Sequence, residues 1–155
     1  MKLRNIISLP VFYEPTATVL GSVHQVVLDD DYRVSYVVFM TNENEERMIP
    51  SPCFVLSRNA VLINDLTSIK PCPLREESTI YERKLGDVIY DGEGREIGSV
   101  SDFVVSMHDH RVWGVEVYSG ALSDILSGRS EIPLEQVTWK SVTSAVVEPE
   151  RGASS

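Results

Sequence analysis

The sequence contains few of the residues that usually build reactive sites. Its 155 residues include two cysteines and three histidines. The cysteines, Cys53 and Cys72, do not form a CxxC pair, which is the spacing typical of zinc and redox sites. We therefore expect two free thiols in a reducing compartment, the cytoplasm, with a single disulfide between them as the alternative.

Long apolar segments are absent as well. No run approaches the roughly 18–20 apolar residues of a membrane-spanning helix, so no membrane span is predicted. The apolar stretch after the basic N-terminus is interrupted by Ser8 and Pro10. It is therefore too short for the core of a signal peptide, which again favours a cytoplasmic protein.

Basic charge is scarce. The chain has 14 Lys and Arg against 23 Asp and Glu, a net charge of -9. Residues 1–77 carry 7 basic and 10 acidic groups (7 − 10 = −3), and residues 78–155 carry 7 and 13 (7 − 13 = −6). Such a surface repels phosphate backbones, so we expect no direct binding to nucleic acid.

What the sequence does have is an internal repeat. Residues 10–28 align without a gap with residues 87–105, at an offset of 77, and six of the nineteen aligned pairs are identical. Further along, Ile49-Pro50 matches Ile132-Pro133 at an offset of 83. A period this long indicates two copies of one small domain rather than a solenoid of short units.

The repeat sets the predicted domain boundaries. We predict domain 1 at residues 1–65, a Pro-rich linker at 66–83, domain 2 at 84–148 and a disordered tail at 149–155. The matching residues of the two copies form a predicted structural signature: Val11, Gly21, Val23, Pro50, Val88, Gly98, Val100 and Pro133.

The apolar runs are short, rich in Val, Ile, Tyr and Phe, and bounded by Gly, Pro, Asp and Asn, which predicts an all-β protein. Strands are expected near 10–13, 19–29, 33–40, 46–50, 53–57 and 60–63, and in the second copy near 87–90, 96–106, 111–118, 130–133, 136–140 and 144–148. One short helix is predicted near 120–127, with Leu122, Ile125 and Leu126 on its apolar stripe.

The long second strand of each copy is expected to bend. In the first copy, apolar alternation loses its phase between Val23 and Leu28, as a bulge would cause. Gly21 and Gly98 stand just before this region, where the missing Cβ allows another backbone to approach closely.

Two shorter signals come from the second copy. Asp91-Gly92 is a dipeptide that supplies the positive φ of a tight hairpin. In the strand predicted at 111–118, Trp113, Val115 and Val117 fall on one side, so we expect all three to face the core.

Each copy resembles the PRC-barrel domain. The strongest stretch is LGDVIYDGEGREIGSV at residues 85–100, and IPLEQV at residues 132–137 resembles the family's closing segment. The first copy matches through LPV at residues 9–11 and LGSV at residues 20–23. The resemblance implies two tandem six-stranded β-barrels. Its motifs are mostly glycines and core apolar residues, so they bring no catalytic residue and no cofactor.

The best candidate metal ligands are His108 and His110, which flank Asp109. A complete site needs a third or fourth ligand nearby, and the sequence shows none, so a polar hairpin tip without metal is the preferred interpretation. A Gly-x-Ser-x-Gly motif is absent, and no histidine lies at a recognisable spacing from either cysteine. We therefore expect a protein that is not an enzyme.

These observations favour a non-catalytic protein-interaction or assembly module, because the resemblance implies a family whose members bind other proteins in assemblies. The protein partner is not identified, and self-association is a further option. The candidate interaction residues are Trp113, Leu122, Ile125 and Leu126. Three alternatives stay open: a small-ligand or metal sensor, an enzyme whose site is assembled in space, and a ribosome- or sporulation-associated factor by family analogy.

Overall fold

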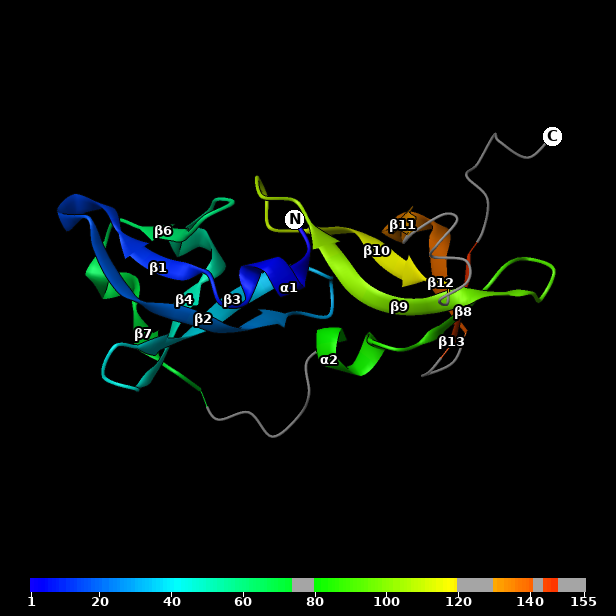
Figure 1. Ribbon diagram of the computed structural model, residues 1–155, viewed down its shortest axis with the longest axis horizontal. Coiled ribbons are helices and arrows are strands. Elements are labelled where there is room, and N and C mark those ends of the chain that lie inside the picture. Colours follow the sequence, from blue (N-terminus) through cyan, green and yellow to red (C-terminus); the bar gives the residue numbers. More distant parts are fainter. Residues whose placement is uncertain (74–79, 120–129, 141–143, 148–155) are drawn as a thin grey trace. The chain divides into compact units, whose positions relative to one another are not determined.

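The structure is a computed structural model that describes residues 1–73, 80–119, 130–140 and 144–147 (Figure 1). The chain divides into two compact units. The first contains Met1–Tyr81 together with Val105–Arg111, and the second contains Glu82–Val104 together with Val112–Ser155. The short segment Val105–Arg111 is therefore part of the first unit, although its flanking strands belong to the second.

Short strands make up most of both units. The first unit contains helix α1 (Leu3–Ile6) and strands β1 (Pro10–Tyr13), β2 (Thr18–Leu28), β3 (Val34–Thr41), β4 (Glu46–Pro50), β5 (Val55–Leu56), β6 (Val61–Ile63) and β7 (Lys70–Pro71). Helix α2 covers Ile80–Lys84. The remaining strands are β8 (Val88–Tyr90), β9 (Glu96–Val105), β10 (Val112–Tyr118), β11 (Ser130–Pro133), β12 (Val137–Trp139) and β13 (Ser144–Val147).

The two sheets have the same strand order, apart from one added edge strand. The first sheet runs β5-β6-β1-β2-β3-β4-β7, and the second, read from its β12 end, runs β12-β13-β8-β9-β10-β11. In each sheet the last strand of the copy pairs in parallel with the first, β6 with β1 and β13 with β8. The two sheets therefore share one strand order and one parallel pairing of their first and last repeat strands.

The all-β class is confirmed, and every expected strand is observed within two residues of its expected bounds. The prediction of two six-stranded barrels is confirmed only in part. The second sheet has six strands, but the first has seven, because β7 adds to β4 by pairing Lys70 with Met48 and Pro71 with Arg47. Strand β7 lies within the segment predicted as a linker, while the predicted domain boundaries themselves stay predictions.

The first strands of the two copies are shifted by one residue relative to the ungapped alignment. Val11 pairs with Gly21, whereas Gly98 pairs with Ile89 rather than with Val88. Val11 and Ile89 are accordingly the fully buried residues, and Val88 is only half-buried. The turn after this strand differs between the copies and compensates for the shift. In the first copy the 3-10 turn Glu14–Thr16 is followed by Ala17, which has a φ of 53°. In the second copy the glycine with positive φ in this turn is Gly94, at 80°, and not the expected Gly92.

The predicted bend of the second strand is confirmed. The pairing of β2 with β3 skips His24, between Val23 opposite Phe39 and Gln25 opposite Val38. Such a bulge puts Val23 and Val26 on the same side and so explains the lost alternation. Strands β2 and β9 are both visibly curved in Figure 1.

The predicted close backbone approach at the two glycines is also present. A Cβ on Gly21 would clash with the carbonyl oxygen of Met40, and a Cβ on Gly98 would clash with that of Tyr118. Both glycines therefore serve the sheet itself, since they let the neighbouring strand pass where any side chain would push it away.

The core of each unit is built from aliphatic and aromatic side chains of the long strands. The largest fully buried ones include Phe39 and Ile49 in the first unit and Ile89 and Phe103 in the second. In the described part of the chain, no helix is long and apolar enough to cross a membrane. The predicted helix near 120–127, with Leu122, Ile125 and Leu126, and the predicted tail at 149–155 lie outside the described residues.

Candidate functional site

Trp113 is the one exposed residue of strand β10. Residues Gly114 to Val117 of β10 are all buried, yet Trp113 is 44% exposed. The prediction that Trp113 faces the core is therefore wrong, although Val115 and Val117 do. The pairing of β10 with β11 begins at Gly114, opposite Pro133, so Trp113 stands one residue beyond that pairing.

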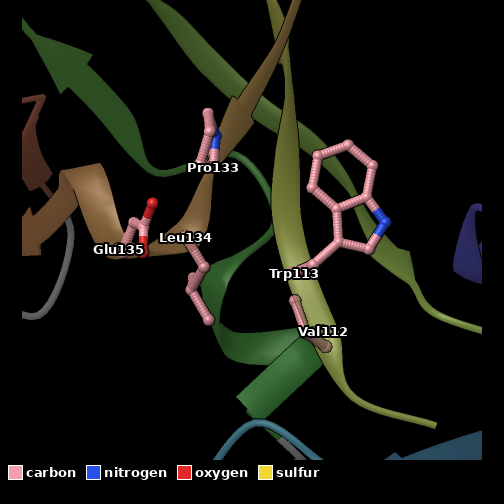
Figure 2. A pocket seen from close by; sticks show the side chains of 5 residues that line it. All are labelled: Val112, Trp113, Pro133, Leu134 and Glu135. Carbon is pink, nitrogen blue, oxygen red and sulfur yellow. The ribbon is translucent and has the colours of Figure 1, made fainter. Parts of the chain in front are cut away.

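Trp113 lies beside an open hollow of about 510 Å³. We call its lining residues the Trp113 surface: Val112, Trp113, Pro133, Leu134 and Glu135. Val112 and Trp113 come from the start of β10, and the other three come from the end of β11 and the 3-10 turn Leu134–Gln136 (Figure 2). Its described lining residues are mostly apolar, and Glu135 supplies the one carboxylate among them.

The first unit has a counterpart to this hollow at the corresponding place in the repeat. Pro50 ends β4 as Pro133 ends β11, and each proline is followed by a 3-10 turn, Ser51–Cys53 in the first unit. Ser51 and Pro52 line a hollow of about 340 Å³ together with Phe54, Val55 and the hairpin residues Met107, His108, Asp109 and His110. The duplicated fold thus forms a hollow at the same turn in both units.

The hairpin turn places His110 against the 3-10 turn of the first unit. His110 has a φ of 59°, and its backbone N–H donates to the carbonyl of Ser106 at 2.9 Å. The carbonyl of His110 accepts from the N–H of Val34, also at 2.9 Å. This backbone conformation turns the imidazole inward, where it is only 8% exposed.

The imidazole of His110 is held by two side chains. Its Nδ1 lies 2.7 Å from the hydroxyl oxygen of Ser51, and its ring stacks on Phe54 with the ring centroids 4.6 Å apart. Burial lowers the pKa of His110, and the negative charge of Asp109 opposes this shift. A neutral, stacked and hydrogen-bonded histidine is a packing residue of this turn.

The predicted metal candidates His108 and His110 do line the same hollow. The third histidine, His24, lies elsewhere, 3.9 Å from Glu46. Within residues 1–73, 80–119, 130–140 and 144–147, no group of three or more His, Cys, Asp and Glu side chains is placed to hold a metal ion. The contact with Ser51 involves Nδ1 of the His110 imidazole.

Trp139 has a different environment from Trp113. Its indole N–H donates to the buried carboxylate of Asp87 at 2.8 Å, and the ammonium of Lys84 lies 3.8 Å from the same oxygen. Lys84 also lies over the Trp139 ring, 5.1 Å from its centroid. These contacts tie α2 and β12 to the start of β8, so Trp139 is a structural residue.

Sequence reasoning missed two fully buried acids of the second unit. Glu116 stands where the first copy has Val38, and its carboxylate accepts from the Ser101 hydroxyl at 2.7 Å. Asp102 is also fully buried and accepts from the backbone N–H of Phe103 at 2.8 Å. The available signal was a single acid between Val115 and Val117, which breaks an otherwise apolar strand.

The position of Leu134 and Glu135 beside the same hollow as Trp113 was missed as well. Of the predicted interaction residues, the structure describes Trp113 alone, and the other three lie outside the described residues. Leu134 and Glu135 join Trp113 only through the pairing of β10 with β11, which brings residues about twenty positions apart to one place.

The comparisons with known proteins agree with this fold. Residues 83–148 match the family model of the PRC-barrel domain, the family that the sequence resembles. The matched segment contains every residue of the Trp113 surface. No curated protein matches the sequence.

Proposed function

We propose that this chain, whose residues 83–148 are a PRC-barrel domain, is a non-catalytic module that binds a protein partner through the Trp113 surface. The observation that carries the proposal is the exposed indole of Trp113 beside an apolar hollow. Trp is the residue type most enriched among those that dominate protein–protein binding energies.

The energetic argument starts from the apolar area of Trp113. Burying apolar surface contributes about 25 cal/mol per Å², so covering a large exposed indole is one of the most favourable single contributions a surface residue can make. Leu134 and Pro133 line the same hollow and extend its apolar area on the side opposite Trp113 (Figure 2). Truncating an anchor of this kind typically costs about 2 kcal/mol or more of binding free energy.

The absence of catalysis is part of the proposal, and it is supported by how the polar side chains are used. The hydroxyl–imidazole pair Ser51 and His110 has the composition of a nucleophile and a base. Its imidazole, however, is buried and stacked on Phe54, which fits a packing role. In the second unit, the Asp87 carboxylate accepts the indole N–H of Trp139, and Glu116 accepts the Ser101 hydroxyl.

Action in the cytoplasm belongs to the same proposal. Cys53 is a free and exposed thiol. A reducing compartment keeps such thiols free, whereas an oxidising one favours their pairing or modification.

The test is site-specific photocrosslinking in the native host. A photoreactive phenylalanine analogue at position 113 is expected to yield a covalent adduct with a protein. The same analogue at Leu85, another exposed apolar residue of this unit, is the matched control and is expected to yield none. No adduct at position 113, or equal adducts at both positions, would count against the proposal.

A further inference from the structure

We propose that the partner segment at the Trp113 surface is cationic: it inserts an apolar side chain into the hollow and places a Lys or Arg between the indole of Trp113 and the carboxylate of Glu135. This inference rests on the proposed function and adds the chemistry of the partner. It commits to a protein segment because the hollow is mostly apolar, so a bare cation would leave Leu134 and Pro133 uncovered.

The first observation is the charge of the hollows. Four open hollows are lined by described residues, and each contains one carboxylate and no Lys or Arg among those residues. These carboxylates are Glu135 at the Trp113 surface, Asp109 at the hairpin turn, and Glu96 and Glu14 at the two smaller hollows. The hollow beside Trp113 is the mostly apolar one of the four, and an apolar hollow with an acidic group favours a partner with apolar and basic side chains.

The second observation is that the same unit already binds a lysine in this way. Lys84 lies over the ring of Trp139 and 3.8 Å from the carboxylate of Asp87. An indole face attracts a cation through its negative face, and the carboxylate adds a charge partner. Trp113 and Glu135 bring an indole and a carboxylate to the lining of one open hollow, and its described lining residues include no lysine (Figure 2).

The third observation concerns the neighbouring charges. Arg111 precedes Val112 in the chain, but the Asp109 carboxylate accepts from its backbone N–H at 3.1 Å, and the positive charge of Arg111 helps to lower the pKa of Asp109. The next acid on β11 is Glu131, which is exposed. A second copy of this chain carries a net charge of -9 and is repelled, so a basic partner is favoured over self-association.

The test uses three defined peptides of equal length in which leucine alternates with lysine, glutamine or glutamate. Binding to the full chain is followed by the indole N–H signal of Trp113 in NMR spectra, identified by its loss in Trp113→Phe. We expect the lysine peptide to shift this signal saturably and to bind about threefold to tenfold more tightly than the glutamine peptide. The glutamate peptide is expected to bind most weakly.

Two matched variants separate a local site from general attraction to an acidic protein. Glu135→Gln is expected to remove most of the preference for lysine over glutamine, and Glu131→Gln is expected to keep it. The inference is overturned if both variants lose the preference for the lysine peptide equally. It is also overturned if the lysine and glutamine peptides bind equally well, or if the Trp113 signal does not respond. Displacement of the peptide by spermidine at equal concentration would also overturn it. None of these results depends on crosslinking at position 113, so the proposed function can fail or stand separately.

Discussion

At the scale of single residues, the glycines and the buried histidine carry the most specific information. Gly98 is required because a Cβ would clash with the carbonyl oxygen of Tyr118, and Gly21 meets the same constraint at Met40. His110 fills its place through the stacking contact with Phe54 and the contact with Ser51. These positions serve the fold, and each gives a prediction that is independent of binding.

Gly98→Ala is expected to destabilise the protein by about 1–3 kcal/mol, because the strands must separate to admit the new methyl group. Urea unfolding followed by circular dichroism measures the loss. Gly92→Ala is the matched control, because a Cβ there meets nothing within 4 Å, and its effect is expected to stay within about 0.5 kcal/mol. Equal stability of the two variants would contradict the close approach of the strands.

The burial of His110 predicts that the folded protein loses stability in mild acid. Its pKa in the folded protein is lowered by burial, so folding favours the neutral imidazole, and the unfolded chain takes up the proton first. The stabilisation is complete above the ordinary value of about 6.5 and is lost as the pH falls through the window between that value and the lower folded pKa. Urea midpoints between about pH 8 and pH 5 measure this.

The variant that tests this assignment is His110→Phe, which keeps an aromatic ring beside Phe54 but cannot be protonated. It is expected to flatten the pH dependence across this window. If His110→Phe keeps the full pH dependence, the assignment to His110 is wrong.

At the scale of elements, the second unit is tied together by a polar cluster at its edge. Trp139 of β12 donates to the buried Asp87, which precedes β8, and Lys84 of α2 lies against both. The cluster connects elements that are far apart in sequence, so its loss affects the whole unit. It also explains why Trp139 does not serve as a binding surface.

Trp139→Phe is therefore expected to cost about 1–3 kcal/mol, because it leaves a buried carboxylate without its indole donor. Trp113→Phe, at the other tryptophan, is expected to be nearly neutral for stability. Thermal unfolding of the two variants gives the comparison. A larger loss of stability for Trp113→Phe than for Trp139→Phe would contradict the structural role assigned to Trp139.

Sequence patterns were most informative about elements and least informative about the contacts between them. Short β-branched runs between turn residues indicated the strands, and the repeat indicated that their order would recur. The alignment could not detect the shift of one residue between Val11 and Ile89, because the turn after each strand differs in length. The exposure of Trp113 depends on where the pairing of β10 with β11 begins, and a strand pattern does not contain that information.

At the scale of the whole molecule, a duplicated β-sheet domain repeats one surface feature. The 3-10 turn after the fourth strand forms a hollow in each unit. In the first unit the hollow is lined in part by the hairpin turn that holds His110, and in the second it contains the exposed Trp113. The two units therefore share the turn and differ in the side chains around it, and the exposed indole makes the second hollow the better candidate for a partner.

The most direct test of this account is the affinity of the crosslinked partner for the purified full chain, measured by titration calorimetry. Trp113→Ala is predicted to weaken binding at least about thirtyfold, which corresponds to about 2 kcal/mol, while its unfolding midpoint stays unchanged. Leu85→Ala is predicted to bind like the unaltered chain. An unchanged Kd for Trp113→Ala would contradict the central claim that this indole anchors a protein partner.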